Sequence, residues 1–254
     1  MIHGTAIVHP NAKIDRTVEI GPYCVVGENV TIGAGTVLQA HVVVNGWTQI
    51  GADCEVYPFA TIGASSQDKK YTGERAYTKI GNRTIVREYA SIQRATGEGE
   101  YTIVGDDCLF LAYTHIAHNC IVGNNVVMSN LAQLAGHVEV GDHAVLGGMA
   151  GIHQFVRVGK YVMIGGASKV TKDVPPFFLV EGSPPRPYGL NSVGLRRGEF
   201  SAEQRDEIKR FYKILYDPQH NVSQALEAMK AAVSTTCGED LITFIEASQR
   251  GVIK

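Results

Sequence analysis

The stretch "YTHIAHNC", Tyr113 to Cys120, brings together residue types that can carry chemistry. Two histidines stand three residues apart, and a cysteine follows two residues later. Histidine and cysteine are common zinc ligands, and histidine is also the side chain most often used as a general base. The stretch is therefore compatible with a zinc site or with a catalytic base. The direction of each side chain decides between the two, and that direction depends on the surrounding structure.

A period of six residues runs through the first two thirds of the chain. Every sixth residue from Ile2 to Val170 is apolar, with three exceptions at Asp68, Glu74 and Glu98. Helices have a period of 3.6 and simple strands a period of two, so neither produces this pattern. A short strand followed by a tight turn does repeat every six residues, and three such units close one triangular coil. We therefore predict a hexapeptide-repeat parallel β-helix whose apolar residue in each hexapeptide, the inward residue, faces the core.

The chain divides into two predicted domains. Residues 1–188 form the β-helix, and its interruptions mark two loops at 64–79 and 94–102, a place where function is often carried. Glycine often follows the inward residue, and we interpret these glycines as corners that need unusual backbone conformations. Residues 189–254 form a small helical domain that covers the end of the solenoid, with helical patterns at 201–216, at 223–233 and from about Asp240. Ser201 and Gln204 predict a capping box for the first of these helices.

The predicted fold class is thus an all-β left-handed parallel β-helix with a small C-terminal α-helical domain. A net charge of −2 gives no basic surface for nucleic acid or an anionic membrane. No apolar run reaches the length of a membrane span, and the first residues do not resemble a signal peptide. Five cysteines, an odd number, fit a reducing compartment. We therefore expect a soluble cytoplasmic protein.

The hexapeptide register predicts where side chains point. Four cysteines lie four residues after an inward residue, a small inward-facing position, so we interpret them as core residues rather than metal ligands: Cys24, Cys54, Cys108 and Cys120. His118 lies two residues after Ile116, at a corner, and is expected to point outward. Residues one and two coils further on should line the same side of the solenoid, together with His115: Gly136, His137, His153 and Gln154.

Two different kinds of protein also fit a hexapeptide solenoid with several histidines. Three histidines could hold zinc between subunits, as in the carbonic anhydrases built on this fold. A non-enzymatic scaffold, such as an ice-binding protein, would instead show an outward ladder of threonines on one flat face. The sequence shows no such ladder, and the two loops would interrupt a flat face.

The chain closely resembles the UDP-N-acetylglucosamine O-acyltransferases that begin lipid A biosynthesis. The resemblance runs almost from end to end and rests on these stretches: "SSQDKKYTGE", "HVVVNGWTQIG", "THIAHNC", "LAGHVEVGD", "GGMAGIHQFVRVG", "VTKDVPP" and "YGLNSVGLRRGEFS". A later N-acyltransferase of the same pathway is the alternative within the fold. That family has a further domain before its solenoid, whereas the period here begins at Ile2.

The resemblance implies a homotrimer with active sites in the clefts between subunits and without a cofactor or metal. The enzyme would move an acyl chain, typically 3-hydroxylated, from acyl carrier protein to the 3-position of UDP-N-acetylglucosamine or of its 3-amino analogue. By matching motifs, His118 is the general base, and the backbone N–H of Gly136 faces the developing oxyanion.

The same matching assigns binding roles to further residues. Those implied for the sugar, diphosphate or acyl group are Gln67, Asp68, Lys70, His115, His137, His153 and Gln154. Asn191 and Arg197 match positions that hold the nucleotide, and Gly166 matches one that limits acyl-chain length. The sequence departs from the family at Asn119, where an acidic residue usually follows the base, at Val193, where an acidic residue is also usual, and in the shortened basic run "LRRG".

Overall fold

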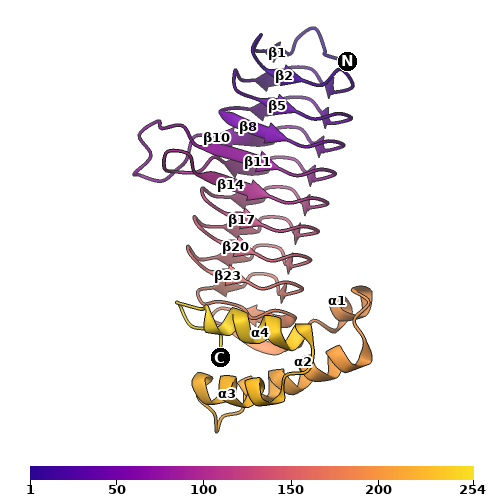
Figure 1. Cartoon of the computed structure of the whole chain (residues 1–254). Helices are drawn as coiled ribbons and strands as arrows, with labels where there is room; N and C mark the ends of the chain where they lie inside the picture. The colour runs from indigo at the N-terminus through magenta and orange to yellow at the C-terminus, as the bar shows by residue number, and fades with distance from the viewer.

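The computed structural model describes residues 1–254 and shows a triangular solenoid with a group of helices at one end (Figure 1). Each coil gives one short strand to each of three sheets, and strands of neighbouring coils pair in parallel. Sheet B contains β1 (Ile7–Val8), β4 (Val25–Val26), β7 (Val43–Val44), β10 (Thr61–Ala64), β13 (Ser91–Gln93), β16 (His115–Ile116), β19 (Gln133–Leu134), β22 (Gly151–Ile152) and β25 (Lys169–Val170).

Sheets C and A complete the prism. Sheet C contains β2 (Lys13–Ile14), β5 (Thr31–Ile32), β8 (Trp47–Ile50), β11 (Tyr77–Ile80), β14 (Tyr101–Val104), β17 (Ile121–Val122), β20 (Glu139–Val140) and β23 (Arg157–Val158). Sheet A contains β3 (Glu19–Ile20), β6 (Val37–Leu38), β9 (Glu55–Val56), β12 (Ile85–Val86), β15 (Leu109–Phe110), β18 (Val127–Met128), β21 (Val145–Leu146), β24 (Met163–Ile164), β26 (Phe178–Gly182) and β27 (Pro185–Leu190). The predicted left-handed parallel β-helix is confirmed.

The core of the solenoid consists of stacked inward residues. Ile116 pairs with Leu134, which pairs with Ile152 on the next coil, and all three are buried. The four cysteines of the register are also buried and free of disulfides. Burial raises the pKa of the Cys120 thiol to about 12, because a thiolate would be poorly solvated there. These cysteines are core residues, as predicted.

The expected reason for the glycines after the inward residues is wrong at nearly all of these positions. Only Gly63 among them adopts a left-handed backbone, with φ at +73°; elsewhere that conformation falls two residues later, mostly on residues such as Tyr113, Asn119 and His137. A Cβ added to Gly81 would instead lie 2.5 Å from the carbonyl carbon of Gly105 in the next coil. Glycine is required at these positions because the backbones of adjacent coils approach closely.

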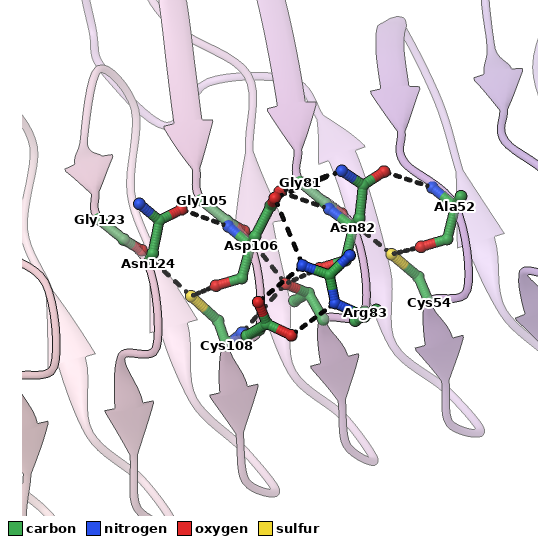
Figure 2. A network of polar contacts seen from close by, with 12 residues as sticks. Ala52, Cys54, Gly81, Asn82, Arg83, Gly105, Asp106, Cys108, Gly123 and Asn124 are labelled. Carbon is green, nitrogen blue, oxygen red and sulfur yellow. Dashed lines mark hydrogen bonds and ion pairs between the residues drawn. The ribbon is translucent and has the colours of Figure 1, made fainter.

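The corner between sheets C and A carries a ladder of side chains (Figure 2). Its members lie two residues after an inward residue, and each accepts a hydrogen bond from the backbone N–H at the same position of the preceding coil. Asn82 Oδ1 accepts from Ala52 N at 2.9 Å, Asp106 Oδ1 from Asn82 N at 2.8 Å, and Asn124 Oδ1 from Asp106 N at 2.8 Å. The ladder satisfies backbone donors that the turn leaves without a strand partner.

The two predicted loops leave the solenoid after β10 and β13 and project together from one side (Figure 1). Glu74 of the first loop accepts a hydrogen bond from Gly97 N of the second at 2.8 Å, and Ser66 Oγ lies 2.6 Å from Thr96 Oγ1. The hydrogen bond from Gly97, with others from the backbone, lowers the pKa of Glu74 to about 2. The loops therefore hold each other in place.

Helices cover the last coil of the solenoid, as predicted (Figure 1). They are α1 (Ser192–Arg197), α2 (Ala202–Leu215), α3 (Val222–Ala232) and α4 (Thr236–Glu246). The capping box of Ser201 and Gln204 is present at α2. The last helix begins at Thr236 rather than near Asp240, and neither α1 nor the antiparallel hairpin of β26 and β27 was expected. None of the helices combines the length and hydrophobicity that a membrane crossing requires.

Candidate active site

His118 lies at the corner between sheets B and C, two residues after the inward residue Ile116. The expectation that it points outward holds only in part. Its side chain is 11% exposed, because the first loop lies over the corner and brings Asp68 within 3.9 Å of it. The imidazole is thus at the surface of the solenoid but inside a cleft.

Asn119 sets the tautomer of His118. The Nδ1 atom of His118 lies 3.0 Å from Asn119 Oδ1. The same oxygen accepts a hydrogen bond from Thr96 N at 2.9 Å, and Asn119 Nδ2 donates to Thr96 O at 3.1 Å, so the orientation of the amide is fixed by the second loop. Because an amide oxygen only accepts, Nδ1 carries the proton and donates. The Nε2 atom is left with a free lone pair, as a base requires.

The free Nε2 atom faces Asp68. The 3.9 Å between Nε2 and Asp68 Oδ2 is too long for a direct hydrogen bond. Asp68 is held from the other side, because its backbone N–H donates to Ser66 Oγ at 3.1 Å and its Oδ1 accepts from Lys70 N at 3.0 Å. A hydroxyl group that reached both the imidazole and this carboxylate would be oriented by the two together.

Gly136 follows His118 one coil later at the same corner. A Cβ at this position would lie 2.5 Å from His118 Nε2, so only glycine leaves room for the ring. The N–H of Gly136 donates to no group of the chain, although the residue is buried. This N–H is therefore free to bind a substrate, and it stands beside the base.

An open cleft of about 470 Å³ surrounds these two residues, and its lining also includes Gln67, His115 and His153. His115 Nδ1 lies 2.7 Å from Ser91 Oγ, and burial together with the neighbouring His118 lowers the pKa of His115. Gln93 and Lys169 line the cleft too and were not predicted. The hexapeptide register could have predicted both, because each residue directly flanks an inward residue of sheet B.

Three more predicted site residues lie near this cleft without lining it: His137, Gln154 and Lys70. The ring of His137 meets His118 edge-on at 5.2 Å and stacks on Phe155 at 4.7 Å, and it lines a neighbouring cavity. Burial lowers the pKa of His137. Gln154 occupies the same corner one coil beyond Gly136, and Lys70 is exposed on the first loop.

Gly166, Asn191 and Arg197 are remote from His118 on the same chain. Gly166 lies at the corner between sheets A and B. Asn191 and Arg197 line a third cavity of about 490 Å³ against sheet A. The Asn191 side chain caps α1 by accepting from Gly194 N at 2.9 Å and donates to Tyr161 O at 2.9 Å. One chain therefore distributes its predicted site residues over all three corners of the prism.

The histidines do not assemble into a metal-binding group within the chain. No three His, Cys, Asp or Glu side chains come together in a manner that could hold an ion. His137 is committed to its stack on Phe155, and Cys120 faces the core.

Comparison with known proteins defines the family. Residues 173–253 match the model described as Udp N-acetylglucosamine O-acyltransferase, Domain 2, and residues 29–64 and 101–136 match the bacterial transferase hexapeptide model. The acyl-[acyl-carrier-protein]–UDP-N-acetylglucosamine O-acyltransferase of Thermodesulfovibrio yellowstonii is 49% identical over 100% of this chain and 99% of its own. The corresponding enzyme of a Psychrobacter species is 47% identical, again over 100% and 99%.

Solved structures of proteins with the same activity superpose on this chain. LpxA from Acinetobacter baumannii superposes with a TM-score of 0.96 at 42% identity, covering 100% of this chain and 99% of that one. The Francisella novicida UDP-N-acetylglucosamine acyltransferase gives 0.97 at 38% identity, with 100% and 94% covered. The hexapeptide solenoid and its histidine cleft define a hexapeptide-repeat acyltransferase. Within that class, the chain belongs to the family of UDP-N-acetylglucosamine O-acyltransferases.

Proposed function

We propose that this enzyme transfers an acyl chain from acyl carrier protein to the 3-position of UDP-N-acetylglucosamine, the first step of lipid A biosynthesis. One observation carries the proposal. The free Nε2 of His118 and the unpartnered N–H of Gly136 lie side by side in one cleft. A base and an oxyanion donor in the same cleft are what acyl transfer to a hydroxyl requires.

The chemistry follows from this pair. The sugar hydroxyl binds between His118 Nε2 and Asp68, and Nε2 removes its proton as the oxygen attacks the thioester carbonyl. The Gly136 N–H donates to the oxyanion that forms. When the tetrahedral intermediate collapses, the C–S bond breaks and the imidazolium returns its proton to the leaving thiolate. A positioned base contributes roughly 10²–10⁴-fold in rate, and no metal or cofactor takes part.

We also propose that the enzyme works as a homotrimer. Exposed apolar side chains run along the corner between sheets A and B: Tyr23, Phe59, Tyr89, Tyr113, Leu131 and Met149. Rings in this row, with His41 among them, stack at 4.8–5.0 Å. If this edge packs against the histidine edge of a neighbour, Gly166 of one chain comes near His118 of the next. Such a head-to-tail contact closes into a ring.

A trimer also gives the nucleotide residues access to a shared site. Asn191 is already engaged by the α1 cap, so we propose that Arg197 makes the stronger nucleotide contact. Val193, exposed in the same cavity, provides no carboxylate there. A monomer that retained full activity in light scattering and assay would exclude the trimer.

We place the enzyme in the cytoplasm. All five cysteines are buried free thiols, which suits a reducing compartment.

An acyl-transfer assay tests the function. Purified enzyme is given acyl carrier protein thioesters of several chain lengths with UDP-N-acetylglucosamine or its 3-amino analogue, which distinguishes ester from amide formation. We expect acyl carrier protein to be a far better donor than acyl-coenzyme A. Activity lost on chelation and restored by zinc would instead favour the carbonic anhydrase type of site. Gly166→Met should shift the preference to shorter chains, and an unchanged preference would remove Gly166 from the acyl groove.

A further inference from the structure

The C-terminal segment returns to the solenoid and is anchored by a buried carboxylate. Asp173 is 1% exposed, and its oxygens accept from Arg157 N at 2.9 Å and from Ser248 Oγ at 2.7 Å. Its backbone N–H donates to Gly251 O at 3.1 Å, and its carbonyl accepts from Ile253 N at 2.9 Å. A buried carboxylate persists only when hydrogen bonded in this way. The segment around residue 250 is therefore fixed against the last coil.

This anchor holds Arg250 at the edge of the active-site cleft. Its Nε and Nη2 atoms lie 3.4 and 3.3 Å from Thr171 O, and Nη2 lies 3.4 Å from His153 Nδ1. Guanidinium has five donor N–H groups, so several remain free. Arg250 is exposed and lines an open cavity of about 730 Å³ next to the cleft.

The contact with Arg250 also bears on His153. Its Nδ1 lies 3.1 Å from Gln154 O as well as 3.4 Å from Arg250 Nη2. One nitrogen cannot donate to the carbonyl and accept from the guanidinium at the same time. When it accepts from Arg250, Nε2 carries the proton and becomes a donor at the cleft.

The last coil of the solenoid carries two further cations. Lys169 lines the cleft from sheet B, and Lys172 occupies the corner position that His118, Gly136 and Gln154 hold in the preceding coils. Neither lysine has a carboxylate within 4.0 Å, and neither has Arg250. The nearby carboxylate of Asp173 is buried and already accepts hydrogen bonds from Arg157 N and Ser248 Oγ. Arg250 and Lys169 thus line two adjoining cavities without an ion-pair partner, and Lys172 is exposed on the same coil as Lys169, so the local charge favours an anion.

We propose that Arg250, supported by Lys169 and Lys172, binds a phosphate group of a substrate. The inference rests on the proposed function, in which two phosphates are present: the phosphodiester of the donor's phosphopantetheine arm and the diphosphate of the acceptor. The position of these cations favours the phosphodiester of the donor. Asp68 lies on the N-terminal side of His118, whereas the cations lie up to three coils away on the C-terminal side, about 14 Å at the roughly 4.8 Å spacing of parallel strands. A thioester carbonyl at Gly136 would leave an extended arm pointing toward them.

The test pairs a change in the enzyme with a change in the ligand. Acyl-phosphopantetheine and acyl-pantetheine, which lacks the phosphate, are compared as donors for the parent, Arg250→Ala and Arg250→Lys. The parent should prefer the phosphorylated donor. Arg250→Ala should raise the KM for that donor about tenfold and leave the KM for the other donor unchanged, because one charge-assisted hydrogen bond is lost. Arg250→Lys should recover part of the loss. Arg186→Ala, an exposed arginine on β27 that also has no ion-pair partner, is the control and should match the parent.

Calorimetric binding of phosphopantetheine and of UDP to the same variants separates the possible results. Weaker binding of phosphopantetheine alone assigns the donor phosphate, and weaker binding of UDP with a raised KM for the sugar nucleotide assigns the acceptor diphosphate. Unchanged binding of both ligands by Arg250→Ala overturns the site. A parent enzyme that binds phosphopantetheine through Arg250 but transfers no acyl group would refute the proposed function and leave the phosphate site standing.

Discussion

Two corners of the same solenoid put the same backbone position to opposite uses. At the corner between sheets C and A, the residues two places after the inward residue bond to one another from coil to coil (Figure 2). At the corner between sheets B and C, the equivalent residues are His118, Gly136 and Gln154, and no such ladder joins them.

The difference shows where this fold can place chemistry. The side-chain oxygen of an Asn or Asp in the ladder accepts a hydrogen bond from the backbone N–H of the preceding coil, so that donor is satisfied. Gly136 has no such partner, because the following coil offers Gln154 without a bond to it. The free donor beside the free imidazole thus results from the absence of such a ladder at this corner. Activity and stability should therefore respond oppositely to substitutions at the two corners.

Removing the base should have the largest effect. His118→Ala should lower kcat by roughly 10²–10⁴-fold while thermal unfolding stays close to that of the parent, since the ring is not part of a ladder. Steady-state assay and thermal melting measure the two quantities. His9→Ala, an exposed histidine of the first coil, serves as the control. A His118→Ala enzyme with near-parent turnover would remove the base from this corner.

A single methyl group should disturb the same corner almost as much. Gly136→Ala retains the backbone N–H but places a Cβ 2.5 Å from His118 Nε2, so the ring must move. A displacement of this kind costs on the order of 10²-fold in kcat. Gly4→Ala, where an added Cβ meets nothing within 4 Å, is the matched control. Equal activity of the two variants would mean that the ring position is not critical.

The ladder corner should show the reverse behaviour. Asn82→Ala removes the acceptor of Ala52 N and should lower the free energy of unfolding by about 1 kcal/mol, with turnover unchanged. Thermal unfolding at one fixed protein concentration measures the loss, because assembly makes Tm depend on concentration. Lost turnover with unchanged stability would contradict the inference that this corner stabilises the fold and the other corner carries the chemistry.

The smallest effect concerns the residue that orients the base. Asn119→Asp keeps an acceptor for His118 Nδ1–H and adds a negative charge, which favours the imidazolium. The acidic limb of the kcat/KM profile should therefore move to higher pH, since the base is then lost at a higher pH. The carboxylate cannot donate to Thr96 O as the amide does, so a loss of a few-fold in kcat should accompany the shift. A profile that overlays the parent's would show that Asn119 does not govern the ring.

The hexapeptide period determined much of the fold in advance. It placed the inward residues, the four buried cysteines and the corner of His118, because a register of six leaves little choice of side-chain direction. The capping box at α2 was equally local, since Ser201 and Gln204 satisfy each other's backbone.

Features that depend on distant partners were missed. The early start of α4 involves Glu207 of α2, whose carboxylate accepts from Ser234 N and Thr235 N just before the helix. The clamp of Asn119 on Thr96 joins residues 23 apart through a loop that has no period. Arg250 reaches Thr171 from the other end of the helical domain. No local sequence pattern predicts contacts of this kind.

The two ends of the solenoid differ, and this has a consequence for how the molecule opens. The first coil is uncovered, with Ile2 and Ile7 51% and 67% exposed, whereas the last coil lies beneath helices. Because each coil contacts only its neighbours, local opening spreads along one dimension from the weaker end. Amide hydrogens should therefore exchange fastest around β1 to β3 and slowest near β22 to β25. His118 and Gly136 follow β16 and β19, several coils away from the uncovered end, so the first coils can open while these two residues stay in place.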